Sequence, residues 1–226
     1  MGAHLDQGFR GLAAYGEVDL SACFSPRSKP VFLLVFLLRR PSAEFVRRFL
    51  VSQNDQPFSY DRLGATREET SPRNYNVDHT RLQLGSGVDV FHQACNAVRQ
   101  WKMFDMPWLQ LCWPDAPIEA GATVAVLISH AGFWSLNPCR IVYVVEEDGA
   151  CEKYGFAYGT LPAHGERGEE RFSVEFHRND SSVWYDIYAF SRPRLMARLA
   201  YPYSRALQRR FARDSMAAMV RSASSR

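Results

Sequence analysis

The sequence predicts an α+β domain in which a curved antiparallel sheet of about six to seven strands wraps around a long C-terminal helix. Short apolar runs of strand length recur from residue 107 onward. Turn-forming residues separate these runs by hairpin-length gaps, which favours antiparallel neighbours over βαβ units. The last segment, from Pro193 to about Ser222, carries apolar side chains at helical spacing. A helix of that kind would cover the apolar face of the sheet.

The chain begins with a segment that shows no sustained periodicity, and we expect a loosely ordered extension over residues 1–35. A single domain is expected over residues 36–224. Its first helix is predicted after Ser42, which can act as the N-cap, because Phe45 and Phe49 follow at helical spacing.

The next part of the chain predicts a long connection, a strand and a helix. Residues 54–76 are rich in Asn, Asp, Pro, Ser and Gly, which is typical of a loop. Residues 77–84 alternate in the manner of a strand, and the run Gly85-Ser86-Gly87 ends it. Residues 88–101 carry the i, i+3/i+4 apolar stripe of an amphipathic helix.

The second half of the chain predicts six further strands and the closing helix. The strands are Trp108–Trp113, Thr123–His130, Arg140–Glu146, Tyr154–Leu161, Glu170–Phe176 and Val183–Ser191. The turn signals between them include Asn137-Pro138 and residues 162–168. Pro202 suits the first turn of the closing helix. That helix has an apolar stripe (Tyr203, Leu207, Phe211, Ser215, Met219) and a basic opposite side (Arg205, Arg209, Arg210, Arg213, Arg221).

Composition excludes several classes of protein. A chain of 226 residues with 46% hydrophobic and 23% charged residues can bury a substantial core. The net charge of +3 argues against a nucleic-acid partner. The longest apolar run, Val31–Leu38, is far shorter than the roughly 20 residues of a membrane span. Five cysteines without a C-x-x-C pair favour a reduced protein, so we expect a cytoplasmic location.

Several motifs in the chain resemble one known family. They are residues 57–60 (PFSY), 64–67 (GATR), 155–164 (GFAYGTLPAH), 168–172 (GEERF), 183–187 (VWYDI), 190–193 (FSRP), 201–202 (YP) and 208–213 with Gln208, Phe211, Ala212 and Arg213. Together they resemble the uncharacterised family called domain of unknown function nineteen-ninety, over roughly residues 36 to 221. That family implies no activity. The order of elements is also similar to the START-like helix-grip fold, whose members bind lipids, hormones and polyketides between sheet and helix.

The densest group of ionisable residues is His164, Glu166, Glu169 and Glu170. A histidine near carboxylates can act as a general base or contact a ligand. The competing interpretation is a solvated hairpin loop in which the histidine holds the turn by hydrogen bonds. No metal-ligand spacing appears in the group, and no nucleotide or cofactor motif appears in the chain, so we predict neither a metal nor a cofactor.

Glu170 is the more specific candidate for a functional residue, because it shares one strand face with Phe172 and Val174. If that face packs inward, the carboxyl needs a partner or a raised pKa. Arg140, just before an apolar strand, is the predicted partner. A structural ion pair and a functional one both fit this pattern.

Three hydroxyl-bearing residues on apolar strands, Tyr158, Tyr185 and Ser191, are predicted to line a ligand cavity with Arg140 and Glu170. His130 is expected to be a core histidine. Gly155 and Gly159 lie within one predicted strand and indicate a bulge or a close backbone approach.

Three functions fit the sequence. The first is a protein that binds a small apolar ligand, such as a lipid, an isoprenoid or a polyketide, between the sheet and the last helix. The second is a cyclase, dehydratase or hydrolase that uses His164 or Glu170 as acid or base in that cavity. The third is an interaction protein that places the basic side of the last helix on a membrane surface or a nucleic acid.

Overall fold

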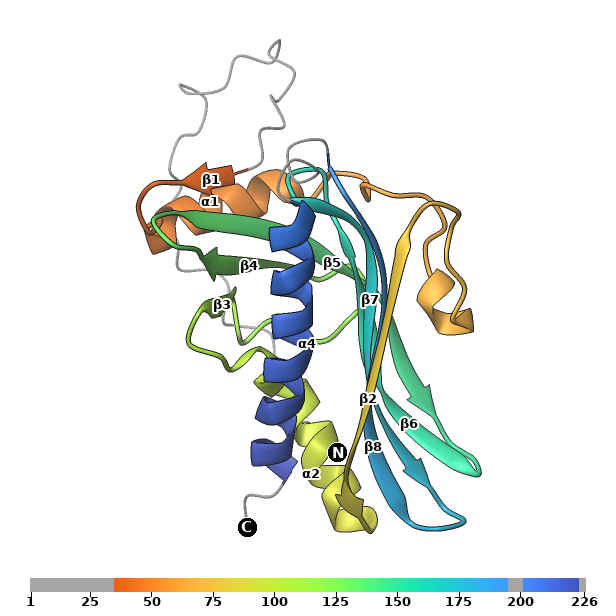
Figure 1. Ribbon diagram of the computed structural model, residues 1–226. Helices are drawn as coiled ribbons and strands as arrows, with labels where there is room; N and C mark the ends of the chain where they lie inside the picture. The colour runs from red at the N-terminus through yellow and green to blue at the C-terminus, as the bar shows by residue number, and fades with distance from the viewer. Residues whose placement is uncertain (1–34, 195–200, 224–226) are drawn as a thin grey trace, which may run out of the picture. The chain divides into compact units, whose positions relative to one another are not determined.

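The structure is a computed structural model that describes residues 35–194 and 201–223 (Figure 1). Apart from Val35, the predicted extension over residues 1–35 lies outside the described residues. In chain order the elements are β1 (Val35–Leu37), α1 (Ala43–Gln53), the 3-10 helix η1 (Ala65–Glu68), β2 (Asn76–Ser86), α2 (Val88–Arg99), the 3-10 helix η2 (Lys102–Phe104), β3 (Leu109–Cys112), β4 (Thr123–Ser129), β5 (Trp134–Glu147), β6 (Cys151–Thr160), β7 (Glu166–His177), β8 (Ser182–Pro193) and α4 (Tyr201–Ala223).

The strands form one curved antiparallel sheet in the order β2-β8-β7-β6-β5-β4-β3. The short strand β1 pairs with the start of β5, where Val35 is opposite Leu136. The predicted α+β architecture, a curved antiparallel sheet with a long C-terminal helix, is confirmed. No helix among the described residues is both long and apolar enough to cross a membrane.

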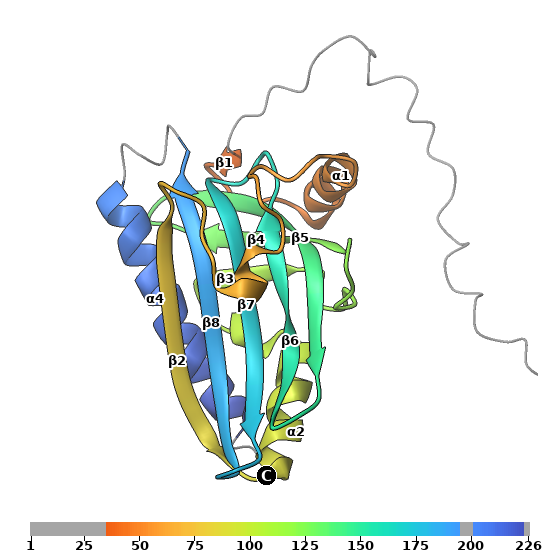
Figure 2. The same cartoon turned by 90° about the vertical axis from the view of Figure 1, so that its right-hand side faces the viewer.

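Helices α2 and α4 lie on the inner face of the sheet, and Figure 2 shows α4 behind β2 and β8. The predicted stripe of α4 faces the sheet: Met219 is fully buried, and the Phe211 ring lies 5.5 Å from that of Phe104. The Ser215 hydroxyl is 3.0 Å from the Tyr185 hydroxyl on β8. Burial of these side chains, rather than helix propensity, holds α4 on the sheet.

The outer face of the sheet is covered by two separate segments, both in front of the sheet in Figure 2. Helix α1, capped by Ser42 as predicted, buries Val46 and Leu50 against β4 and β5. Phe45, one of the two phenylalanines whose spacing predicted this helix, is 37% exposed. The long connection between α1 and β2, including η1, lies over β6, β7 and β8.

One predicted turn is wrong, and another is shorter than predicted. Asn137 and Pro138 lie inside β5, and Asn137 donates from Nδ2 to the Val126 carbonyl oxygen at 3.3 Å. Proline is tolerated there because Pro138 lies where β5 leaves β1 and begins to pair with β6. The turn predicted over residues 162–168 is shorter, because β7 already begins at Glu166. This earlier start places further acidic side chains in the sheet.

Candidate ligand-binding cavity

A cavity of about 640 Å³ lies between the inner face of the sheet and α4. Most of its wall is apolar and includes Phe104, Trp108, Ile187, Leu207, Phe211 and Met216. Polar residues from β2, β5, β6, β7, β8 and α4 also line it. The alternation of β7 brings Glu166, Gly168 and Glu170 to this face.

Glu170 and Tyr158 are direct cross-strand partners on the inner face, and the Tyr158 hydroxyl donates to Glu170 Oε2 at 2.8 Å. Burial raises the pKa of Glu170 to about 7, the carboxyls of Asp78 and Glu166 add to the rise, and the bond from Tyr158 opposes it. Near neutral pH this side chain is therefore present in both the acid and the carboxylate form.

Glu166 also faces the cavity. Its Oε2 atom is shielded from solvent and has no hydrogen-bond donor among the described residues. Burial raises the pKa of Glu166, although Ser191, Arg205 and Gln208 each lower it. Gln208 on α4 donates from Nε2 to Ser191 Oγ at 3.0 Å, so these two residues hold each other at the cavity wall.

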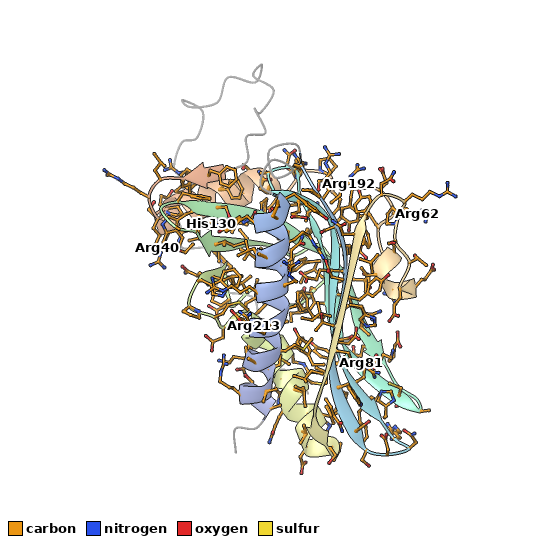
Figure 3. All side chains as sticks on the ribbon, in the orientation of Figure 1. Arg40, Arg62, Arg81, His130, Arg192 and Arg213 are labelled. Carbon is orange, nitrogen blue, oxygen red and sulfur yellow. The ribbon has the colours of Figure 1, made fainter. Side chains whose placement is uncertain are left out.

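An ion pair joins α4 to β2 beside the carboxyls. Arg205 donates from Nη1 and Nη2 to the two carboxylate oxygens of Asp78, at 2.6 and 2.7 Å. Such bidentate geometry fixes the position of both side chains. The prediction that Arg205 belongs to a solvent-facing basic side is therefore wrong. Arg213, labelled on α4 in Figure 3, is exposed as predicted and lies 3.1 Å from the Asp214 carboxylate.

His164 lies in the turn before β7 and lines the cavity. Its Nδ1 accepts a hydrogen bond from the Glu166 backbone N–H at 2.9 Å. Burial lowers the pKa of His164 to about 4, and the nearby Arg194 contributes to that fall. The imidazole is therefore neutral at pH 7, with Nδ1 engaged by the backbone.

His130, labelled in Figure 3, also lines the cavity instead of lying in a closed core. Its ring nitrogens are 2.7 Å from the Tyr203 hydroxyl and 2.8 Å from the Ser135 hydroxyl. It thereby connects the start of α4 to the sheet.

The predicted pair between Arg140 and Glu170 does not form. The two side chains lie on opposite faces, and the Arg140 guanidinium donates to the backbone oxygens of Gln53, Asn54 and Gln56 at 2.6–2.9 Å. Arg140 therefore anchors the segment after α1 and does not line the cavity. Tyr185 is fully buried against Ser215 and is also absent from the cavity lining. The other predicted residues, Tyr158, Glu170 and Ser191, do line it.

Glu169 points to the outer face, where the connection over the sheet supplies its partners. It accepts hydrogen bonds from the Tyr60 hydroxyl at 2.6 Å, from the backbone N–H of Gly64 at 2.8 Å and of Thr66 at 3.0 Å, and from the Thr66 hydroxyl. Gly159 leaves room for the Tyr60 ring, because a Cβ there would overlap the tyrosine hydroxyl. The predicted close backbone approach is found at Gly155, where a Cβ would overlap the Phe172 carbonyl oxygen, whereas at Gly159 a side chain makes the close approach.

Sequence reasoning treated His164, Glu166, Glu169 and Glu170 as one group in a loop and the first residues of the next strand, whereas the structure divides them between two faces of the sheet. It also missed Asp78 and Gln208. The sequence contained a signal for this division, because side chains alternate between the two faces along a strand. Glu166 and Glu170 are four positions apart and share a face, whereas Glu169 lies on the other. No local signal identified Asp78, whose partner lies 127 residues away.

Two other groups of side chains resemble metal sites in composition: Cys151, Glu175 and His177, and Glu69, His79 and Asp186. In the first, Lys153 lies 2.9 Å from Glu175. In the second, Arg171 lies 2.8 Å from Glu69 and 2.9 Å from Asp186. The carboxylates therefore already have cationic partners, and we interpret both groups as ion-pair networks.

Comparison with known proteins gives a consistent result. The model of the family described as "Domain of unknown function (DUF1990)" matches residues 59–218. A UPF0548 protein of Dictyostelium discoideum is 35% identical over 210 residues, covering 84% of this chain and 97% of the relative. A UPF0548 protein of Deinococcus radiodurans is 36% identical over 201 residues, covering 84% and 99%. Among solved structures, norcoclaurine synthase from Thalictrum flavum has a TM-score of 0.38 and 12% identity, covering 74% of this chain and 95% of that one.

Proposed function

The chain belongs to the DUF1990 family and to the UPF0548 proteins, and from that premise we propose that it binds a small, largely apolar molecule between the sheet and α4. The observation that carries the proposal is the cavity of about 640 Å³. Ligand pockets typically occupy about 300–1,000 Å³ and combine apolar walls with a few placed polar groups. This cavity has both features, because its aromatic and aliphatic walls end at Tyr158, Glu170 and Glu166.

The proposal is tested with two substitutions of the same kind on one helix. Ala212 lines the cavity and Ala217 is exposed on the other side of α4. Titration with Nile red, a neutral apolar dye, should give saturable fluorescence with the wild-type protein. We expect Ala212→Phe to weaken binding by about tenfold or more, because the added ring fills the cavity, and Ala217→Phe to leave it unchanged. Equal affinities of the two variants, or no saturable binding by the wild type, would refute the proposal.

A second candidate function, acid–base catalysis, is favoured by one specific observation. Glu170 has a pKa of about 7 and is hydrogen-bonded to Tyr158 in a largely apolar cavity. A group with both forms populated near neutral pH can donate or accept a proton in a cyclase, dehydratase or hydrolase reaction.

The catalytic candidate requires a molecule on which to measure turnover. Native mass spectrometry of the purified protein, compared with its denatured mass, identifies any retained small molecule for that purpose. Glu170→Gln should keep binding this molecule and slow its conversion by about 10²-fold or more. Unchanged conversion by the variant would remove Glu170 as the acid or base.

A further inference from the structure

Three arginines lie together at the end of the sheet where β7 begins and β8 ends. Arg167 and Arg192 are direct cross-strand partners in the β7–β8 ladder, which brings their Cβ atoms to about 5 Å from each other on one face. Arg194 continues the register, because its backbone N–H donates to the Gly165 carbonyl oxygen at 3.2 Å. Arg194 is thus the diagonal neighbour of Arg167, within reach of a long side chain. We call these three residues the arginine cluster.

The arginine cluster lies on the outer face of the sheet. Arg167 is two positions from Glu169, whose side chain points outward. The Arg192 guanidinium carbon is 4.8 Å from the centroid of the Tyr75 ring, in the connection that covers the outer face. Figure 3 shows Arg192 at the end of the molecule where α4 begins. None of the three arginines lines the ligand cavity, so the cluster is separate from the binding site proposed above.

No described carboxylate neutralises the arginine cluster. Among the residues that the structure describes, none of its three guanidinium groups forms an ion pair or donates a hydrogen bond. Arg171, on the same strand and the same face, contrasts with them, since its guanidinium lies 2.8 Å from Glu69 and 2.9 Å from Asp186. Like charges directly opposite each other destabilise a sheet. An anion at the cluster would therefore relieve a repulsion that the protein itself leaves uncompensated.

The arginine side chains are partly enclosed, and their outer nitrogens stay accessible. All three residues are half-buried. In Arg167 and Arg194 the Nε atoms are shielded from solvent, and they are the only nitrogens of these two guanidinium groups that are both enclosed and without a partner. Their Nη groups, which also have no acceptor, therefore reach the surface. The Tyr75 ring supports the third guanidinium. The surroundings thus hold the three groups in place with N–H donors directed to solvent.

We infer that the arginine cluster binds the phosphate group of a phosphate monoester. Charge and geometry select this class. A phosphate monoester carries a charge of about −1.5 to −2 at pH 7 and three acceptor oxygens, whereas a carboxylate carries a single charge. The planar fork of a guanidinium matches two phosphate oxygens at once. The phosphate group can belong to a soluble compound or to a lipid headgroup, because both present the same oxygens.

Calorimetric titration of the whole protein with glycerol 3-phosphate, at pH 7.5 and one salt concentration, tests the inference. We expect saturable binding by the wild type, and binding of acetate that is weaker by about tenfold or more. Arg167→Gln should weaken the binding of glycerol 3-phosphate by about tenfold or more. The matched control is Arg178→Gln, just beyond the other end of β7, which should bind as the wild type does. Its guanidinium already has partners, Asp148 at 2.9 Å and Glu152 at 2.8 Å.

Vesicles separate the two sources of the phosphate group. Flotation with phosphatidylcholine vesicles that contain phosphatidic acid, a lipid phosphate monoester, is compared with flotation on pure phosphatidylcholine. Binding of glycerol 3-phosphate without vesicle binding supports a soluble ligand. Binding to the phosphatidic acid vesicles that Arg167→Gln loses and Arg178→Gln keeps supports a lipid headgroup.

Three outcomes would overturn the inference. They are no binding of either phosphate source, equal affinity for acetate and glycerol 3-phosphate, and equal weakening by Arg167→Gln and Arg178→Gln. Arg192→Gln is a second variant that should weaken binding to a similar extent, so the test does not depend on one substitution. Circular dichroism of each variant confirms that it is folded. Glycerol 3-phosphate should also raise the unfolding temperature of the wild type and leave that of Arg167→Gln unchanged.

Discussion

Consecutive residues of β7 carry carboxyl groups to opposite faces of the sheet, and their surroundings differ. Glu169, on the outer face, accepts hydrogen bonds from a tyrosine, a threonine hydroxyl and two backbone N–H groups. Glu170, on the inner face, accepts one from Tyr158. The outer carboxyl is 2% exposed and its acceptors are used by the protein itself. The inner carboxyl borders a cavity and keeps acceptor positions free.

The comparison shows how burial alone fails to distinguish a structural acid from a candidate functional one. Both side chains are withdrawn from water, and a buried carboxyl is stable only when donors or a raised pKa compensate for lost hydration. On the outer face the connection between α1 and β2 supplies the donors. On the inner face the pKa of Glu170 rises to about 7 instead. The Glu170 carboxyl therefore still has acceptor positions that a ligand can use.

The largest expected effect is on the outer face. Glu169→Ala leaves the Tyr60 hydroxyl and the N–H groups of Gly64 and Thr66 without their acceptor, and we expect a loss of about 3–5 kcal/mol in the free energy of unfolding. Urea unfolding at pH 7 measures it. Glu170→Ala is the matched change on the inner face and should cost about 1 kcal/mol or less at the same pH. An equal loss in the two variants would refute the distinction between the faces.

An intermediate effect is expected from the pH dependence of stability. The pKa of Glu170 in the folded protein, about 7, lies above its ordinary value of 4.5. The neutral form therefore stabilises the fold fully below pH 4.5, and this contribution is lost as the pH rises through 7. Glu170→Gln stays neutral, so its stability relative to the wild type should increase by about 1–3 kcal/mol between pH 5 and pH 8.

The comparison of wild type and variant cancels the opposing contribution of His164. The pKa of His164 is lowered to about 4, so its contribution is present above pH 6.5 and is lost as the pH falls toward 4 in both proteins. Thermal or urea unfolding at pH 5, 6, 7 and 8 supplies the difference curve. A flat difference would show that Glu170 titrates in the folded protein as it does in water.

The smallest effect is expected on the side of α4 that faces solvent. Arg213→Gln removes an exposed pair with Asp214 and should change the free energy of unfolding by less than about 0.5 kcal/mol. Arg205→Gln, on the same helix, breaks the bidentate pair with Asp78 and should cost about 1 kcal/mol. Urea unfolding measures both losses. A larger loss for Arg213→Gln than for Arg205→Gln would contradict the prediction that Arg205 makes the stabilising contact.

Much of the fold was predictable because the local periodicity of apolar residues indicates strands and helices. The alternation over Glu170–Phe176 and the stripe of Phe211, Ser215 and Met219 both gave the correct inward side. The errors lie where local signals mislead. Asn137-Pro138 has the composition of a turn, yet the pairing of β5 with three neighbours over its length keeps it in the sheet.

The candidate site was predictable only in part. Tyr158, Glu170 and Ser191 were identified because their strand positions fix the face on which they lie. Arg140 was misassigned because it begins an apolar run, and nothing in that run reveals the backbone oxygens after α1 that it binds.

The sequence by itself determined the antiparallel sheet, the closing helix and the strand parity that separates Glu169 from Glu170, since each depends on residues within a few positions of one another. Only the tertiary structure decided which carboxyl receives donors and which faces a cavity. Tyr60 reaches Glu169 across 109 residues, and Arg205 reaches Asp78 across 127. Contacts over such separations depend on the packing of whole elements, and no local pattern encodes them.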